Sequence, residues 1–382
     1  MADDNKNNPD PFEEFGDTEK ESFTGERTRE VKVDANVSKC PTCGANLVYS
    51  PARKKLHCEY CGTDVSVDLT DFAEEIPFSE LLKSAPDWKD ETRVFACKNC
   101  GARTIVSKKD IAPVCPYCGT KSVVEESDLV GLKPNAVLPF LIDDKAAAEK
   151  FKKWAKRKLY APRKYKKNVR PEQIRGNYFP AFTFDSDTLS TYNGRLGEYY
   201  YVTVRRNGKT YQERRVRYYS ISGTYSRFFN DVLVYANKSR DEKRMNKLLP
   251  FATDYAQKYN EDFIYGFGAT QYEKDGTECW CEAQARMRSA VQKAILSQYV
   301  YDFVDYLNVD TAFGKVTYKY MLLPVYIGHS KYNGKLYNFY VNGQNGNVAG
   351  KSPVSPVKVL FTVLIGLAAL AGIGVLLYFL LR

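Results

Sequence analysis

The chain has 382 residues, a formal net charge of +10 at pH 7 and an aromatic content of 14%, with 29 tyrosines. This length allows two or three domains with a sizeable core. The aromatic content excludes a wholly disordered chain and favours a fold rich in strands.

The N-terminal segment, residues 1–36, is predicted to be a disordered acidic tail. Its first 21 residues carry eight acidic and two basic side chains among Asn, Asp, Pro and Gly. Such a segment has too little apolar surface to offset the entropy that it would lose on ordering.

Eight of the ten cysteines form an internal repeat of two C-x2-C-x14-C-x2-C units. The first unit, in residues 37–66, has Cys40, Cys43, Cys58 and Cys61. The second unit, in residues 94–126, has Cys97, Cys100, Cys115 and Cys118. In each unit, two thiolates leave one tight turn, and a hairpin brings back a second pair to complete a tetrahedral four-sulfur site. Glycine follows each C-x2-C pair, at a position that tends to need a positive φ.

We interpret the two units as zinc ribbons joined by a linker, residues 67–93. Four thiolates leave no open position, so both zinc ions are expected to be structural. Disulfides are disfavoured in a reducing cytoplasm, whereas spacing alone does not separate zinc from iron. His57 is expected to be a strand residue beside the first site and not a ligand. Cys279 and Cys281 form an unmatched C-x-C pair, and we expect them to be packing residues, with a redox role as the alternative.

Residues 127–350 are predicted to form an α+β domain with a mainly antiparallel sheet, because strand and helix patterns mix without a βαβ rhythm. Helices are expected near 144–160, 240–258 and 278–301. For the first of these, Asp143 or Asp144 supplies the cap, and the apolar residues at helical spacing are Ala147, Phe151, Trp154, Ala155 and Leu159. Hairpins are expected at the Asn-Gly pairs of residues 207–208 and 333–334.

Much of the positive charge lies in one segment, residues 145–175, with 13 Lys or Arg side chains against Glu149 and Glu172. The basic helix within it could face solvent, anionic lipid or nucleic acid, since cations and aromatic residues alternate there. The candidate contact residues are Lys152, Lys153, Lys156, Arg157, Arg163, Lys164, Lys166 and Lys167.

The last predicted element is a transmembrane helix over residues 359–381, preceded by a juxtamembrane linker, residues 351–358. The helix has 23 uncharged residues and at about 1.5 Å per residue it is long enough to cross a bilayer. Lys351 and Lys358 precede the helix, and only Arg382 follows it. The positive-inside rule therefore predicts a single-pass, tail-anchored protein of the cell membrane, with its N-terminal domains in the cytoplasm.

A G-x-x-x-G-K-S stretch at residues 346–352 resembles a phosphate-binding loop, but its first glycine is one residue too close. A true loop of this kind also follows a buried strand and opens a helix, whereas here Pro353 and Pro356 follow. We therefore expect residues 342–350 to form a β-hairpin. The chain has only two histidines, neither in a nucleophile–base arrangement, and we expect no enzymatic activity.

The paired cysteine units, together with "VLPFLID", "NYFPAFTFD" and "LLPVYIGHSKYNGKLYNFYVNGQNGNVAGKSP", carry a family resemblance. The chain resembles the bacterial membrane-anchored double zinc-ribbon proteins, often labelled transcription-factor-IIB-type zinc ribbons. Some members are labelled primosomal replication factor Y or superfamily II helicase, although 382 residues leave no room here for paired motor domains. The resemblance implies zinc at the eight cysteines, membrane attachment and a place in stress-linked assemblies that hold peripheral proteins on the membrane.

Two functions from different classes follow from these features. The first is a zinc-binding membrane adaptor, or scaffold, which docks cytoplasmic or membrane proteins through its ribbons and its α+β domain. The second is a membrane-tethered regulator that binds nucleic acid through the ribbons and the basic segment, residues 145–175. A tethered protein searches DNA poorly, so the adaptor is the preferred reading.

Overall fold

The structure is a computed structural model. It describes residues 39–67, 71–81, 92–107, 114–121, 123–126, 132–167, 174–238, 242–260, 263–264 and 267–380. The predicted acidic tail lies outside these residues, as do parts of the linker and of the basic segment. The class is α+β, as predicted, with two cysteine-bearing β units, a large sheet and a C-terminal apolar helix.

The first cysteine unit forms a small antiparallel sheet of its own, in the order β1-β2-β3. Its strands are β1 (Val48–Ser50), β2 (Lys55–His57) and β3 (Asp64–Ser66). Apolar side chains at the middle of each strand point inward, and these are Tyr49, Leu56 and Val65. Tyr49 also packs on Phe263 of the main body, which joins the unit to the larger core.

The second cysteine unit belongs to the large sheet. Its strands are β5 (Thr92–Cys97), β6 (Arg103–Ser107) and β7 (Val123–Glu126). β6 pairs with β13 (Gly268–Thr270), and β13 pairs in parallel with β9 (Ile174–Arg206). A second parallel pair joins β8 (Ala136–Val137) to β14 (Phe303–Tyr332), so the sheet is mixed, although its long pairs are antiparallel.

Short elements complete the body of the sheet. They are β4 (Ile76–Pro77), α1 (Phe78–Leu81), α3 (Arg163–Lys167), β11 (Val234–Tyr235), β12 (Gln257–Lys258), β15 (Lys335–Asn342) and β16 (Val348–Gly350). β15 and β16 form the hairpin that was predicted in place of a phosphate-binding loop. The turn at residues 333–334 also forms as predicted, with positive φ at both residues.

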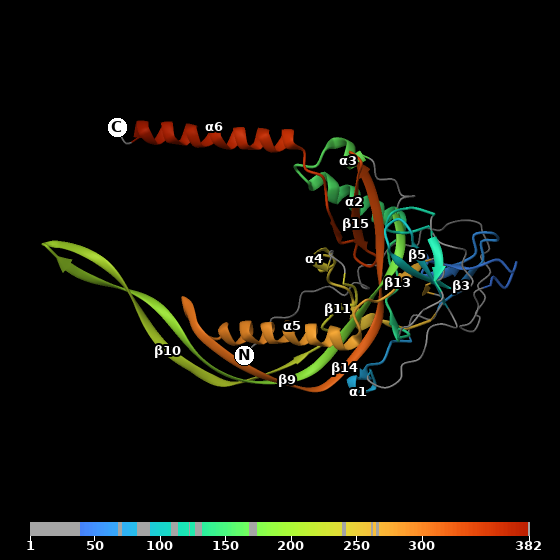
Figure 1. The fold of residues 1–382 in the computed structure, drawn as a ribbon, viewed down its shortest axis with the longest axis horizontal. Coiled ribbons are helices and arrows are strands. Elements are labelled where there is room, and N and C mark those ends of the chain that lie inside the picture. Colours follow the sequence, from blue (N-terminus) through green and yellow to red (C-terminus); the bar gives the residue numbers. More distant parts are fainter. Residues whose placement is uncertain are drawn as a thin grey trace, which may run out of the picture.

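Two very long strands, β9 and β14, pair along most of their length and curve together (Figure 1). β10 (Lys209–Phe229) runs back along the other edge of β9 from a turn at Asn207 and Gly208, where φ is 50° and 75°. These positive φ values suit the type I′ turn that the Asn-Gly pair predicted. β14 begins opposite Gly197, so beyond that point β9 and β10 continue as a two-stranded ribbon. We call this ribbon, residues 198–217, the arm.

α5 (Gly276–Leu296) packs against the curved sheet (Figure 1). It was predicted over 278–301, and the Asp275 carboxylate caps it by accepting from the Glu278 N–H. The fully buried side chains of one face recur at helical spacing, and they are Cys279, Ala283, Met287, Val291 and Ile295. They share a core with the aromatic residues of β9 and β14. Cys279 is therefore a packing residue, as expected, whereas Cys281 is exposed.

α2 (Asp144–Arg157) confirms the predicted basic helix, and the Asp143 carboxylate caps it at the Ala146 N–H. Leu159 departs from the prediction, because α2 has ended and the side chain is 68% exposed. The helix predicted over 240–258 is wrong. Its described part has α4 (Glu242–Met245), a 3-10 turn at Thr253–Tyr255 and the short strand β12, because Pro250 lacks the N–H that a continuous helix needs.

α6 (Pro356–Leu380) begins three residues before the predicted span and is long and apolar enough to cross a membrane. None of its most apolar window is buried in the protein. A core helix of this composition would be covered on at least one face, so the exposure favours a surrounding apolar phase.

We expect Met287→Ala to lower the unfolding free energy by about 2–5 kcal/mol, because it leaves a cavity between α5 and the sheet. Chemical denaturation of the full-length protein in detergent measures this loss. Ser289→Ala, on the exposed face of the same helix, should change the value by less than about 0.5 kcal/mol. Equal effects of the two substitutions would contradict the packing described here.

Candidate metal centres

The four cysteines of the first unit converge on one point. Their sulfur atoms all lie within 4.8 Å of one another. The Sγ–Sγ distance is 3.4 Å from Cys40 to Cys61 and 3.5 Å from Cys43 to Cys58. Four thiolates at about 2.3 Å from a tetrahedral zinc would be roughly 3.8 Å apart, so the cluster has the dimensions of such a site.

The second unit repeats this geometry. The Sγ–Sγ distance is 3.6 Å both from Cys97 to Cys118 and from Cys100 to Cys115, and all four sulfurs again lie within 4.8 Å. The first cysteine of each pair is buried, and the second is more exposed. Each cluster is thus held in place by two buried cysteines, and its two other cysteines lie nearer the protein surface.

One backbone turn builds all four cysteine pairs. In each, the N–H of the glycine after the pair donates to the carbonyl of the first cysteine, at 2.9 Å. The φ of that glycine is positive in every case, at Gly44, Gly62, Gly101 and Gly119. Residues other than glycine rarely adopt this conformation, so the glycine noted in the sequence is what allows the turn.

The backbone also stabilises thiolates in the turns. Burial alone would raise the pKa of Cys40, but N–H donors from Cys43 and Thr42 outweigh it and lower the pKa to about 6. Burial raises the pKa of the Cys115 thiol to about 11. A divalent cation at the centre is what lets four neighbouring sulfurs all be thiolates, and soft ligands in this geometry suit zinc. Each cluster could therefore hold a metal ion such as zinc.

His57 lies on β2, as predicted, and its ring nitrogen Nδ1 is 2.6 Å from a carboxylate oxygen of Asp64 on β3. Arg53 contacts the other oxygen of the same carboxylate at 2.9 Å. Burial opposes ionisation of Asp64, but these two partners prevail and lower its pKa. His57 thus links two strands of the unit, and the four cysteines remain the candidate ligands.

A third acidic group, Glu75, Asp185 and Asp231, already contains a cation from the protein. The Lys319 ammonium is 2.7 Å from a Glu75 oxygen and 2.9 Å from an Asp231 oxygen. Burial would lower the Lys319 pKa, but these carboxylates outweigh it and raise the pKa. The cluster joins the linker to β9 and β14, and we interpret it as a structural ion-pair network.

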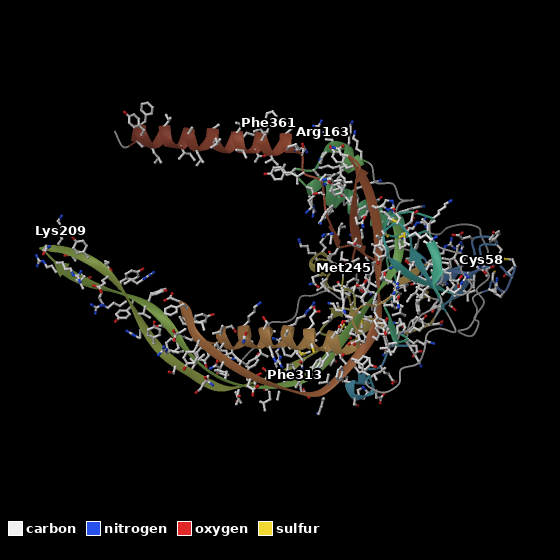
Figure 2. The ribbon with its side chains drawn as sticks, viewed as in Figure 1. Cys58, Arg163, Lys209, Met245, Phe313 and Phe361 are labelled. Carbon is white, nitrogen blue, oxygen red and sulfur yellow. The ribbon has the colours of Figure 1, made fainter. Side chains whose placement is uncertain are left out.

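The eight candidate basic residues lie at α2 and α3 (Figure 2), and Arg163 is drawn beside the first turn of α6. Seven of them are exposed, and Lys166 is partly buried. Cys58 of the first cluster is labelled at the other side of the body from Arg163 (Figure 2). The eight residues therefore do not form one surface with the first cluster, although Arg175 of the basic segment lines a cavity with Glu59 and Pro116 of the two units.

Two features were not predicted from the sequence. One is the length and exposure of the arm, whose tip carries Lys209 (Figure 2). The other is a cavity of about 640 Å³ between the second unit and the sheet. Its walls include the rings of Tyr117, Phe179 and Tyr340, which come from three distant segments. The sequence predicted a hairpin in this region from its strand pattern and its Asn-Gly turn, but contacts between distant segments, and the point where a third strand begins, leave no local pattern.

Comparison with known proteins gives a distant relative. Over 330 residues the chain is 27% identical to a protein of Bacillus subtilis (strain 168) described as "Uncharacterized protein YdjG". The match covers 84% of this chain and 91% of the relative. No family model matches the sequence, and no solved structure matches it.

The cluster geometry predicts two metal ions per chain. We expect elemental analysis of the purified protein to give two zinc ions, and one after Cys97→Ser together with Cys118→Ser. Cys281→Ser, an exposed cysteine outside both clusters, should leave two. Iron in place of zinc, or an unchanged metal content in the double variant, would contradict this assignment.

The Lys319 network predicts a pH-dependent loss of stability. Lys319→Met should lower the unfolding free energy by about 3–5 kcal/mol at pH 7, because the buried side chain of Asp231 and the partly exposed side chain of Glu75 lose their cation. Burial raises the Asp185 pKa to about 6. Asp185 becomes protonated, and therefore uncharged, as the pH falls from 7 to 5. An uncharged carboxyl group needs no neighbouring cation, so the loss of stability in Lys319→Met should shrink over this range.

The control is Lys315→Met on the same strand, where the lysine side chain is 88% exposed and 3.9 Å from Asp187. This change should cost less than about 1 kcal/mol at either pH. Denaturant titrations at both pH values measure the two variants. A cost for Lys319→Met that stays constant with pH would refute the electrostatic explanation.

Proposed function

We propose that the protein is a zinc-binding, tail-anchored membrane adaptor that docks other proteins at the cytoplasmic face of the cell membrane. α6 is the anchor in this proposal, and the two cysteine clusters hold structural zinc. We assign the chain a role in binding other proteins, and we attribute no catalytic step to it.

The observation that carries the proposal is the arm. A two-stranded hairpin is only marginally stable in water, and beyond Gly197 no third strand from the described residues supports this one. It nevertheless exposes the rings of Tyr199, Tyr200, Tyr201 and Tyr211, with fractional exposures between 37% and 64%. Burial of these rings against a partner protein has a more favourable free energy than their exposure to water.

Cations lie beside these rings. Arg214 is 4.4 Å from the centre of the Tyr199 ring, and Arg217 is 5.4 Å from that of Tyr200. Tyrosine and arginine are the residue types that dominate binding energy at protein interfaces. Stacking on a ring also holds each guanidinium in place before a partner arrives, which lowers the entropy lost on binding. We assign the arm to a protein partner with an acidic, partly apolar surface.

The metal units support the same reading. A closed four-sulfur site gives a short chain segment a rigid surface, and the first unit presents Tyr60 with its side chain 88% exposed. The second unit is continuous with the sheet that carries the arm. An adaptor built this way would offer one docking surface at each end of the body.

The test is a pull-down of full-length protein from its own membranes in mild detergent. The variant carries Tyr199→Ser, Tyr201→Ser and Arg214→Ser, which share one face of the arm. We expect a defined set of proteins with the wild type and at least about 30-fold weaker capture with the variant. Leu189→Ser, an exposed apolar residue on the three-stranded part, should not weaken capture.

The alternative function predicts a different result. A membrane-tethered nucleic-acid regulator would retain nucleic acid in a salt-dependent way, with no stoichiometric protein. That outcome would replace the adaptor. Protein capture that survives the arm variant but is lost with Cys97→Ser and Cys118→Ser would instead move the docking site to the second unit.

A further inference from the structure

The turn between α2 and α3, residues 158–162, is hydrogen-bonded to the start of α6. Its carbonyls at residues 159, 160 and 161 all accept from that segment. The Lys358 ammonium donates to Leu159 at 3.1 Å and to Ala161 at 2.8 Å. The Ser355 N–H donates to the Tyr160 carbonyl at 2.8 Å. The turn therefore lies at the level where α6 begins.

A second contact holds α3 to the same segment. The Tyr165 hydroxyl donates to the Lys351 carbonyl at 3.0 Å. The Tyr165 ring is fully buried and lies edge-on to Tyr337 of β15 and to Phe151 of α2. Since Phe151 also stacks on Phe339 of β15, α2, α3 and the residues before α6 form one packed unit on the sheet.

The cations of this unit are not neutralised. No ion pair in the described part of the chain involves a Lys or Arg of α2 or α3. On the sheet, by contrast, Arg195 pairs with Asp305, and Arg215 of the arm lies 3.6 Å from Glu213. Burial and then the nearby Lys358 ammonium lower the pKa of Lys166. The positive charge at the base of α6 is thus available to an external anion.

Apolar side chains stand among these cations. Leu159 is 68% exposed, and Tyr160 is 37% exposed. Val354 and Val357, on the segment that the turn contacts, are 60% and 59% exposed. Cationic side chains around exposed apolar and tyrosine side chains are typical of a membrane interface. There the aliphatic parts of Lys and Arg lie in the headgroup layer, and their charged groups stay in water.

We propose that the α2–α3 turn and the cations beside it form a contact site for the anionic lipid headgroups of the bilayer that α6 enters. This inference rests on the anchoring role of α6 in the proposed function. The first residues of a membrane span lie at headgroup level, and the hydrogen bonds place the turn at those residues. Lipid phosphates would bind Arg163, Lys164 and Lys167, while Leu159 enters the upper acyl region.

Reconstituted full-length protein tests the proposal. Proteoliposomes are made from phosphatidylcholine with a quarter phosphatidylglycerol, and spin-labelled forms of each lipid report which one contacts the protein. We expect the wild type to prefer phosphatidylglycerol several-fold, at up to roughly fivefold per contacting cation. Arg163→Glu with Lys164→Glu and Lys167→Glu should bring the preference to about one.

A matched variant controls for net charge. Arg205→Glu with Arg206→Glu and Lys209→Glu makes the same charge change at the arm tip, where all three side chains are exposed. It should leave the lipid preference unchanged. A wild type without preference, an equal loss in both variants, or displacement of phosphatidylglycerol by an added oligonucleotide would overturn the site.

The depth to which residue 159 enters the bilayer is measured separately. Fluorescence of Leu159→Trp, compared with the wild type, should be quenched by lipids brominated near the top of the acyl chain, and charge reversal should remove this quenching. Alkaline carbonate extraction of the same vesicles tells the two proposals apart. Protein that is extracted disproves the anchor and the site together, whereas protein that stays without lipid preference or quenching disproves only the site.

Discussion

The antiparallel pairing of β9 with β14 is the interaction on which the rest of the molecule depends. β9 carries β10 and the arm, β11, and β13 with the second cysteine unit, whereas β14 carries β4, β8 and the β15 hairpin. The register is set by burial, since Phe182 lies opposite Tyr320 and both are buried against α5. A slip of one residue would turn these rings to the other face, so one pairing fixes the position of every element that is hydrogen-bonded to this sheet.

The two cysteine units differ in how they depend on this sheet. The first has its own three strands and touches the body through side chains such as Tyr49. The second is continuous in hydrogen bonding from β5 through β6 and β13 to β9. A metal at the first site therefore stabilises a local unit, whereas one at the second stabilises an edge of the main sheet. Equal spacing in sequence does not mean an equal structural role.

The features that the sequence predicted are the local ones. The C-x2-C turns, the cap at Asp143 and the Asn-Gly hairpins each depend on a few neighbouring residues, and all form. The helical spacing over 240–258 gave a wrong prediction of one continuous helix. The apolar residues there pack onto the sheet, but most of the backbone between them has no regular secondary structure. Leu248 and Phe251, for example, are buried in the core beside β14.

Strand length and strand order could not be predicted in the same way. Alternating side chains identify a strand, but they do not show that β9 continues from Ile174 to Arg206 while β14 begins only opposite Gly197. That end point creates the arm. The parallel contact of β13 with β9 joins residues far apart in sequence, and no local pattern marks it. The candidate metal ligands were visible because their chemistry is contained in short motifs, whereas the arm and the α2–α3 turn depend on tertiary contacts.

The direction of α6 relative to the arm sets how the protein can sit at a membrane. Both leave the body toward the same side (Figure 1). A Lys or Arg on a strand costs about 2–4 kcal/mol at the bilayer midplane, and the arm tip carries Arg205, Arg206 and Lys209, so the arm must stay in water when α6 crosses.

The segment before α6 is where the direction of α6 can change. Residues 351–355 have no regular secondary structure and are followed by Pro356, which begins the helix. A bend within these residues would keep the hydrogen bond from Tyr165 to the Lys351 carbonyl, but it would break those that Ser355 and Lys358 make to the α2–α3 turn. It would also hold the arm in the water above the headgroups and not across the bilayer. In the adaptor proposed above, the arm would then reach sideways over the membrane from the anchor, toward proteins held at that surface.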